Sequence, residues 1–351
     1  MTGRKPLLGC DKEEIRELVT ESGYQPFRAK QLYHWLYRRK AATFDEMHTL
    51  PAGLRELANE RWETGGTHPV RVDESSDGTK KYLFATRNDR YIETAMIPEG
   101  ERATLCISTQ VGCRRNCTFC QTARQGFKEN VSAGEIVNQY HSVPERDRIT
   151  NIVYMGMGEP LDNVEATLQS IALFTCGDGY ALPSRRITLS TVGIHPHLER
   201  FLDESDASLA ISLHSPFSDE RRQIMPVENA HPIEETVRLV RDRREDKERR
   251  VSFEYTMFSG VNDTARHVEG ISKLLNGLSV RINLIPFHEI AECPLAPTES
   301  GRITEFAELL RAKGFPTSIR RSRGQDINAA CGLLWTRHVR DDGETVRTTR
   351  L

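Results

Sequence analysis

The chain has 351 residues, a formal net charge of −2 and eight cysteines. Its length suits one large α/β domain with a smaller one, and its near-neutral charge excludes a protein that coats nucleic acid without specificity. Local basic clusters, at residues 38–40 and 320–323 for example, still leave RNA contacts open. No apolar run approaches the roughly 20 residues of a membrane span, and the first residues lack the features of a signal peptide. We therefore expect a cytoplasmic protein that makes no membrane contact.

Residues 1–66 are predicted to be mainly helical. The segment DKEEIRELVTESG has apolar residues at helical spacing, and PFRAKQLYHWLYRR and LPAGLRELANERW repeat the pattern. We interpret these helices as a small accessory domain. Two strand-like runs follow, KKYLFAT (80–86) and RYIETAMIP (90–98), and the turn-forming residues RND separate them. They predict a β-hairpin extension over residues 67–98.

Strand-like and helical patterns alternate over the catalytic core that we assign to residues 99–335. Six strand-like runs contain TLCIST, NIVYMGMG, RITLSTVG, SLAISLHS, VSFEYTMF and VRINLIPF. Such alternation implies parallel strands with crossover helices, in a barrel or an open sheet. Parallel barrels place their chemistry at the C-terminal ends of strands, where this chain has the polar or glycine-rich runs GMGEP, STVG and SLHS. The charged tail, residues 336–351, is expected to be disordered.

Three cysteines lie in one short loop, GCRRNCTFCQT, with C-x3-C-x2-C spacing: Cys113, Cys117 and Cys120. Eight cysteines in so long a chain do not suggest a disulfide framework, and thiolates are soft metal ligands. Closed zinc and iron–sulfur sites take four protein ligands, so three cysteines predict a metal centre with one open position. The alternative is one face of a helix with small buried cysteines, but the polar residues after Cys113 argue against it.

This loop resembles that of the radical S-adenosylmethionine (SAM) enzymes. The resemblance implies that three irons of a four-iron cluster bind the cysteines and that the fourth iron chelates SAM. Gly158 and Glu159 of GMGEP could then offer a carbonyl and a carboxylate to the SAM ammonium group. Ser190, Ser212 and His214 could meet its ribose and carboxylate. For either serine alone, an internally satisfied strand-end hydroxyl is an equal alternative.

Three further residues stand apart from that loop. Cys106 and Cys331 have no metal-like partner nearby in sequence, so a buried core position is the plain interpretation of each. Cys331 follows a run of arginines that would lower the pKa of a thiol, which favours a nucleophile. Glu93 alternates with Ile92 in a predicted strand and is either an inward-facing general base or a surface residue.

Nearly the whole chain resembles the radical SAM RNA methyltransferases RlmN and Cfr, which methylate an unactivated adenine carbon. The motifs fall in the family's order, from ATLCISTQVGCRRNCTFCQT through YMGMGEPLDN and SLHSPFSDERRQIMP to GQDINAACG. Few other families combine the three-cysteine loop with a cysteine seven residues before it and an AACG cysteine near the C-terminus. The resemblance implies a partial (β/α)6 barrel behind an N-terminal helical RNA-binding domain.

The resemblance also assigns roles to residues. Cys331 would carry a methyl group taken from one SAM, and a radical generated from a second SAM would activate that group for addition to adenine. Cys106 would then resolve the adduct through a transient disulfide with Cys331, and Glu93 would accept the ring proton. The implied ligands of the 4Fe-4S cluster are Cys113, Cys117 and Cys120. The implied SAM ligands are Gly158, Glu159, Ser190, Ser212, Leu213 and His214.

Three positions depart from the family pattern. His288 stands where the family usually has an asparagine that contacts SAM, and Asn328 and Leu333 alter the loop around Cys331. The motif STVGI leans toward Cfr, which methylates C8, whereas MGMGEP leans toward RlmN, which methylates C2. The choice between the two carbons is open at this point.

The leading hypothesis is C2 methylation of an adenine in 23S ribosomal RNA, with transfer RNA as a second substrate to be tested. We expect a monomer that receives electrons from a reducing donor such as flavodoxin. C8 methylation is the alternative within the family. Two rivals lie outside it: a non-catalytic RNA-binding paralogue, and a radical SAM enzyme for a small molecule or peptide. The helical segment 1–66 argues against the second rival, because a small substrate needs no such arm.

Overall fold

The computed structural model describes residues 3–243 and 249–334, so the expected tail at 336–351 lies outside the described residues. A ten-stranded sheet dominates these segments, in the order β14-β13-β12-β11-β10-β9-β6-β5-β4-β3. Its strands are β3 (Arg71–Glu74), β4 (Lys80–Ala85), β5 (Tyr91–Glu99), β6 (Arg102–Cys106), β9 (Asn151–Tyr154), β10 (Ile187–Thr191), β11 (Ser208–Ser212), β12 (Val251–Met257), β13 (Arg281–Pro286) and β14 (Thr317–Ile319).

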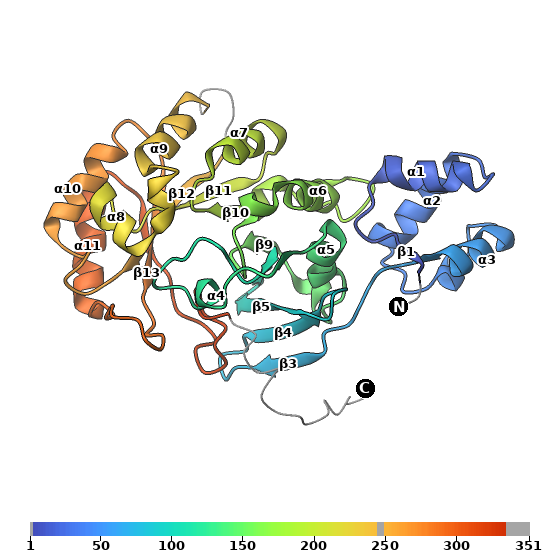
Figure 1. Cartoon of the computed structure of the whole chain (residues 1–351), viewed down its shortest axis with the longest axis horizontal. Coiled ribbons are helices and arrows are strands. Elements are labelled where there is room, and N and C mark those ends of the chain that lie inside the picture. Colours follow the sequence, from blue (N-terminus) through green and yellow to red (C-terminus); the bar gives the residue numbers. More distant parts are fainter. Residues whose placement is uncertain (1–2, 244–248, 335–351) are drawn as a thin grey trace.

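The run from β6 to β14 is parallel throughout, which confirms the α/β fold. The six expected strands are β6 and β9 to β13, and β14 adds a seventh. Figure 1 shows helices along the outer side of these strands. The helices of this part are α4 (Gln121–Arg124), α5 (Ala133–His141), α6 (Val164–Thr175), α7 (His195–Glu204), α8 (Ser218–Ile224), α9 (Ile233–Asp242), α10 (Ala265–Leu274) and α11 (Ser300–Ala312).

The two faces of the parallel strands differ in burial. In β9, Ile152 and Tyr154 are buried under the helices, whereas Asn151 and Val153 on the other face are only half-buried. The strand β10 repeats this alternation, with Leu189 buried. The apolar core therefore lies between sheet and helices, and the inner face of the sheet surrounds an open interior.

The β extension has three antiparallel strands, β3, β4 and β5, and β5 pairs directly with β6. The sequence predicted only the hairpin of β4 and β5. The missed strand β3 reads RVDE and lies at the exposed edge of the sheet, so it lacks the apolar alternation that identifies a strand. The register places Ala95 of β5 opposite Cys106 of β6, which makes the extension a wall of the interior.

The N-terminal helices form a lobe at one end of the molecule's long axis (Figure 1). They are α1 (Lys12–Glu21), α2 (Phe27–Tyr33), a π-helical turn η1 (His34–Arg38) and α3 (Ala52–Arg61). The short strands β1 (Lys5–Pro6) and β2 (Trp62–Glu63), which the sequence did not indicate, pair in parallel and close the lobe. An Asp11 capping box begins α1, as the sequence pattern of a helix start would require.

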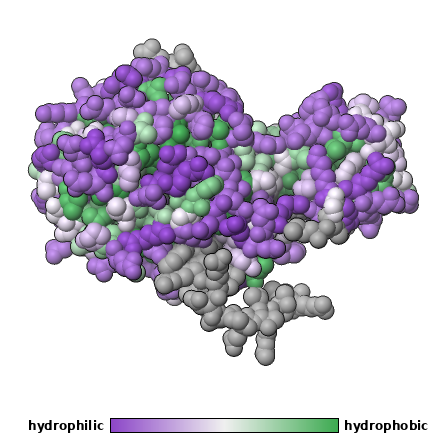
Figure 2. Space-filling model, in the orientation of Figure 1, coloured by the Kyte–Doolittle hydropathy of each residue, from purple (hydrophilic) through white to green (hydrophobic). Residues whose placement is uncertain are grey.

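The lobe packs against the barrel through shared apolar and hydrogen-bonded contacts. The ring of Tyr37 lies 5.5 Å from that of Tyr180, and Gln169 Nε2 donates to the carbonyl of Gly9 at 2.9 Å. Figure 2 shows a largely hydrophilic surface on this face, with a narrower waist between lobe and body. Among the described helices, none combines the length and the apolar character that crossing a bilayer requires.

Candidate active site

The three loop cysteines line one cavity at the C-terminal ends of the parallel strands. Cys113 and Cys117 are buried and Cys120 is half-buried. The loop begins at Gly112, whose φ of +75° is left-handed and whose Cβ, if present, would lie 1.8 Å from the carbonyl oxygen of Gly126. Only glycine fits there, because a side chain would collide with the returning backbone. The chain geometry thus turns all three thiols toward one space.

The electrostatics of the loop suit a cationic centre. Burial raises the pKa of Cys113 to about 12, and burial together with the neighbouring thiols raises the pKa of Cys117 well above its ordinary value. Three desolvated thiols that repel each other as thiolates need positive charge to ionise together, and bound iron supplies it. Within the described residues no cluster of side chains converges on a single metal ion. A multi-iron cluster, in which each cysteine binds a different iron, does not require such convergence.

Glu159 lies on the same cavity and is 3% exposed. Its carboxylate accepts hydrogen bonds from Thr191 Oγ1 at 2.6 Å, from the amide of Val192 at 3.0 Å and from the amide of Leu161 at 3.0 Å. Burial raises the pKa of Glu159 to about 7. The carboxylate therefore ties the GMGEP loop to the end of β10, and a SAM ammonium group bound beside it would favour its ionised form.

The other expected SAM residues divide into two groups. Ser190 and Ser212 line the cavity at the ends of β10 and β11, and Gly158 lies there with a φ of +100°. Leu213 is fully buried in the core, and it is absent from the cavity wall. Its backbone is occupied, since its carbonyl accepts from Arg221 Nε at 3.1 Å. A contact between Leu213 and SAM finds no support in this arrangement.

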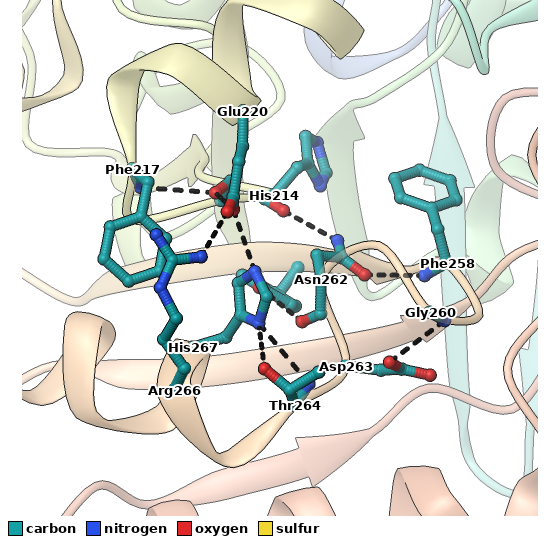
Figure 3. Close-up of polar contacts among 12 residues, drawn as sticks. His214, Phe217, Glu220, Phe258, Gly260, Asn262, Asp263, Thr264, Arg266 and His267 are labelled. Carbon is teal, nitrogen blue, oxygen red and sulfur yellow. Dashed lines mark hydrogen bonds and ion pairs between the residues drawn. The ribbon is translucent and has the colours of Figure 1, made fainter.

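His214 is held rigidly between two loops, as Figure 3 shows. Its carbonyl oxygen accepts from Asn262 Nδ2 at 2.7 Å, while Asn262 Oδ1 accepts from the amide of Phe258 at 2.7 Å. The imidazole Nδ1 accepts from the amide of Thr256 at 2.9 Å. Burial lowers the pKa of His214 to about 3, so the ring is neutral and its proton lies on Nε2. The ring therefore presents a single N–H donor for a ligand.

A neighbouring network fixes the same corner of the barrel (Figure 3). Glu220 of α8 accepts from Ser215 Oγ at 2.9 Å and contacts His267 Nε2 of α10 at 2.8 Å, and it pairs with Arg266. The GVND loop, residues 260–263, lies between these helices and supplies Asn262. The motifs in the sequence predict no role for this loop, and in the structure its Asn262 holds the backbone of His214 in position.

The two isolated thiols both line a second, larger cavity, and Cys331 also lines the cavity of the loop cysteines. Cys331 is exposed, and Cys106 is buried at the end of β6. Burial raises the pKa of Cys106 to about 12, and the charge of Cys331 acts in the same direction, so the two sulfurs are electrostatic neighbours. Arg320 Nη1 lies 3.9 Å from Cys331 Sγ. Both thiols are free in the structure, and a guanidinium faces the exposed one.

Glu93 is buried in β5, on the same face of the sheet as Ala95 and its partner Cys106. Its carboxylate lies 3.0 Å from the Lys81 ammonium group, and both side chains are less than a tenth exposed. Glu93 therefore faces inward, as a general base would, and the alternative that it is a surface residue of the strand is wrong. The carboxylate is already ion-paired, and it lies outside the walls of the cavities.

The departures from the family pattern have local explanations. His288 Nε2 lies 2.6 Å from Ser322 Oγ, so that ring still borders the SAM side of the cavity with a hydrogen bond of its own. Asn328 has a φ of +52°, a conformation that asparagine tolerates better than most residues. Leu333 packs beside the apolar core and lines the cavity near Cys331.

Sequence reasoning missed two residues between the thiols and the barrel. Glu254 is 3% exposed on β12, and its carboxylate accepts from Asn283 Nδ2 at 2.7 Å and lies 3.1 Å from Arg320 Nη2. Met155 Sδ lies 3.4 Å from the same guanidinium. A carboxylate within the apolar strand VSFEYTMF was the available signal for Glu254, since an unpaired charge rarely occupies such a position.

The comparisons with known proteins agree with this geometry. Residues 107–271 match the Radical SAM superfamily, and residues 5–63 match the Ribosomal RNA large subunit methyltransferase N-terminal domain. A crystal structure of a radical SAM methyltransferase from Sphaerobacter thermophilus is similar, with a TM-score of 0.88 and 39% identity over 94% of this chain and 99% of that chain. The fold and the cysteine-lined cavity thus define a radical SAM methyltransferase.

Two relatives narrow the class. The probable dual-specificity RNA methyltransferase RlmN of Bacteroides thetaiotaomicron is 47% identical over 96% of this chain and 97% of its own length. The dual-specificity RNA methyltransferase RlmN of Alkalilimnicola ehrlichii is 38% identical over 93% of each chain. The chain belongs to the RlmN family of radical SAM RNA methyltransferases. This result confirms the family resemblance and argues against the hypothesis of a radical SAM enzyme that acts on a small molecule or peptide.

Enzymes of this class use a 4Fe-4S cluster and SAM. The residues present fit both groups, because three buried thiols, a buried carboxylate and a neutral imidazole donor border one cavity.

Proposed function

We propose that this enzyme methylates C2 of an adenine in 23S ribosomal RNA, and also in transfer RNA, through a methyl group carried on Cys331. The observation that carries the proposal is the placement of Cys331: it borders the cavity of the three loop cysteines and lies beside the second thiol, Cys106. The name of the matched N-terminal family and the words dual-specificity RNA methyltransferase in the relatives' names support an RNA substrate.

Each thiol has a distinct task in this proposal. Cys331 is exposed and faces the Arg320 guanidinium, so its sulfur is accessible for accepting a methyl group. Cys106 is buried, so its thiol stays protonated until the adduct with RNA has formed on its neighbour. The bound cofactors supply the methyl group and the radical that activates it. Glu93, on the strand that pairs with β6, is the proposed proton acceptor, with Lys81 holding its carboxylate.

The remaining assignments are parts of the same proposal. Cys113, Cys117 and Cys120 hold the cluster, and Gly158, Glu159, Ser190, Ser212 and His214 border the SAM site. Residues 1–66 serve as an RNA-binding accessory domain, residues 67–98 as a β extension and residues 99–335 as the catalytic core. The enzyme works as a cytoplasmic monomer with a reducing donor such as flavodoxin.

Anaerobic reconstitution with methyl-labelled SAM and an rRNA fragment tests the proposal. The wild type should transfer label to RNA, and mass spectrometry of the digested product should identify 2-methyladenosine. Cys331→Ala should carry no label on protein or RNA. Cys106→Ala should accumulate a covalent protein–RNA adduct, because no thiol is left to release it. Cys176→Ala, a partly exposed cysteine outside the cavity walls, is the matched control and should behave as the wild type.

Two outcomes would contradict the proposal. If Cys106→Ala released methylated RNA normally, the two-thiol mechanism would be wrong. If the product were 8-methyladenosine, the assignment of the C2 position would be wrong, and the Cfr-like alternative would take its place.

A further inference from the structure

A second cavity of about 1190 Å³ opens at the opposite end of the barrel from the loop cysteines. It shares five wall residues with the SAM-side cavity: Met155, Glu254, Ile285, His288 and Cys331. Its other walls include Thr188, Ser208 and Asn283 near the starts of their strands. Because the strands are parallel, this polar space runs from their N-terminal ends to the two thiols.

Arginines concentrate around this space. Nine of them border it, against two glutamates, although the whole chain has a net charge of −2. Arg102 and Arg281 begin β6 and β13, while Arg185 and Arg186 directly precede β10. One of the two glutamates, Glu254, is already paired with an arginine. Positive charge is therefore gathered where several of the strands begin, and Arg320, Arg321 and Arg323 add to it just after the end of β14.

Most of these arginines are free to bind an anion. Arg102, Arg185, Arg186, Arg281 and Arg321 are exposed, and within the described segments none of them has an ion-pair partner. On the outer helices, by contrast, Arg200 pairs with Glu165 and Glu204. We call these five residues the arginine rim. Unpaired guanidinium groups at an opening are suited to phosphate, which they bind in bidentate fashion.

We propose that the RNA substrate approaches from this end, with the phosphates flanking the target nucleotide held on the arginine rim and the extruded adenosine inserted through the second cavity toward Cys331. The inference rests on the proposed function and adds the route and the surface to it. A cavity of this size exceeds the roughly 300–1,000 Å³ of small-molecule pockets, so it has room for more than one nucleotide. C2 chemistry needs the base outside its stack, so the target adenosine has to be extruded before it can enter this cavity.

The charge pattern favours RNA over an acidic protein. A polyanion with several phosphates matches exposed arginines that are spread along the sheet at β6, β10 and β13, and the polar wall below them offers hydroxyl and amide groups to a base. The lobe contributes less free positive charge at this position, since its Lys40 forms an ion pair with Asp147. The arginine rim therefore holds the target segment, while the lobe is left to contact more distant parts of the RNA.

The test compares two double variants of the reconstituted, SAM-bound enzyme. Arg185→Gln/Arg281→Gln removes rim charges, and Arg222→Gln/Arg238→Gln removes the same charge from exposed positions on α8 and α9. The probe is an rRNA hairpin that contains the unpaired target adenosine, titrated at several salt concentrations. Loss of two phosphate contacts should weaken binding about tenfold or more and should lower the slope of log K against log salt by roughly 1.4–1.8. The control variant should leave both the RNA affinity and this slope unchanged.

Further measurements separate this inference from the proposed function. Methylation of Cys331 by labelled SAM without RNA should be unaffected in the rim variant, and Arg185→Lys/Arg281→Lys should restore most of the salt dependence. Equal RNA affinity and slope in the rim and control variants would overturn the inference. The inference would also be overturned if RNA affinity fell only in the lobe variant Arg38→Gln/Arg39→Gln. If wild-type Cys331 never accepted methyl, the proposed function would fail while the binding result still stood.

Discussion

The two ends of the barrel have opposite chemistry. At the C-terminal ends of the strands, thiols, a buried carboxylate and a neutral histidine surround a cavity of about 170 Å³. At the N-terminal ends, arginines surround a cavity of about 1190 Å³. The first is small, largely buried and suited to a cation, whereas the second is wide and suited to a polyanion. In the arrangement that we propose, the cationic cofactor and the anionic substrate enter from opposite ends of the barrel and meet at Cys331.

The largest expected effect lies at the cofactor end. Cys117→Ser replaces a buried thiol that we propose as a cluster ligand, and we expect the reconstituted variant to lose the cluster and all cleavage of SAM. Iron and sulfide analysis, together with detection of 5′-deoxyadenosine, measures this loss. RNA affinity should stay near the wild-type value, because the rim lies at the other end. Parallel loss of RNA binding would show that the two ends are not independent.

A second prediction concerns the support of the cofactor end. Arg221 and Glu228 form an ion pair in which both side chains are almost fully buried, and Arg221 also donates to the carbonyls of Ser212 and Val192 at the strand ends. Arg221→Met leaves an uncompensated buried carboxylate, so it should lower the free energy of unfolding by about 3–5 kcal/mol. Chemical denaturation of the metal-free protein measures this value.

The matched control for that pair is the double variant Arg221→Met/Glu228→Gln, which removes both charges. It should be less destabilised than Arg221→Met alone. If the double variant lost as much free energy of unfolding as the two single variants together, Arg221 and Glu228 would not be energetically coupled.

The smallest effect is a pH dependence located at the cofactor end. The folded protein keeps His214 neutral down to a pKa of about 3, whereas the unfolded chain protonates it near its ordinary value of about 6.5. The unfolded state therefore binds more protons in this window, so stability is present above about pH 6.5 and is lost as the pH falls. The loss from this residue is at most about 1.4 kcal/mol per pH unit.

Denaturation of the metal-free protein between pH 7 and 5 checks this prediction. His214→Asn should flatten the dependence, while His68→Asn, at an exposed position in the β extension, should not. An unchanged slope in His214→Asn would place the acid-sensitive group elsewhere.

The sequence predicted one end of the barrel far better than the other. The cofactor end is encoded in short contiguous motifs, GCRRNCTFC, GMGEP and SLHS, so their spacing together with the family resemblance indicated its residues. The arginine rim joins single residues from strands that are far apart in sequence, and it becomes a surface only when the strands align in parallel. Side-chain contacts between strands could not be predicted for the same reason. No local pattern indicates that Lys81 forms an ion pair with Glu93. Nor does one indicate that Arg320 lies between Glu254 and Cys331.

Hydrogen bonds join the loop of the three cysteines to the loop of the methyl acceptor. The amide of Gln121, next to Cys120, donates to the carbonyl of Gly332 at 2.8 Å, and Thr122 Oγ1 donates to the carbonyl of Leu334 at 2.8 Å. The segment that we propose to bind iron therefore also holds the residue after Cys331 in place. We expect assembly of the cluster to bring Cys331 into the position in which it accepts a methyl group. A chain without iron should then not methylate Cys331 and should consume no SAM.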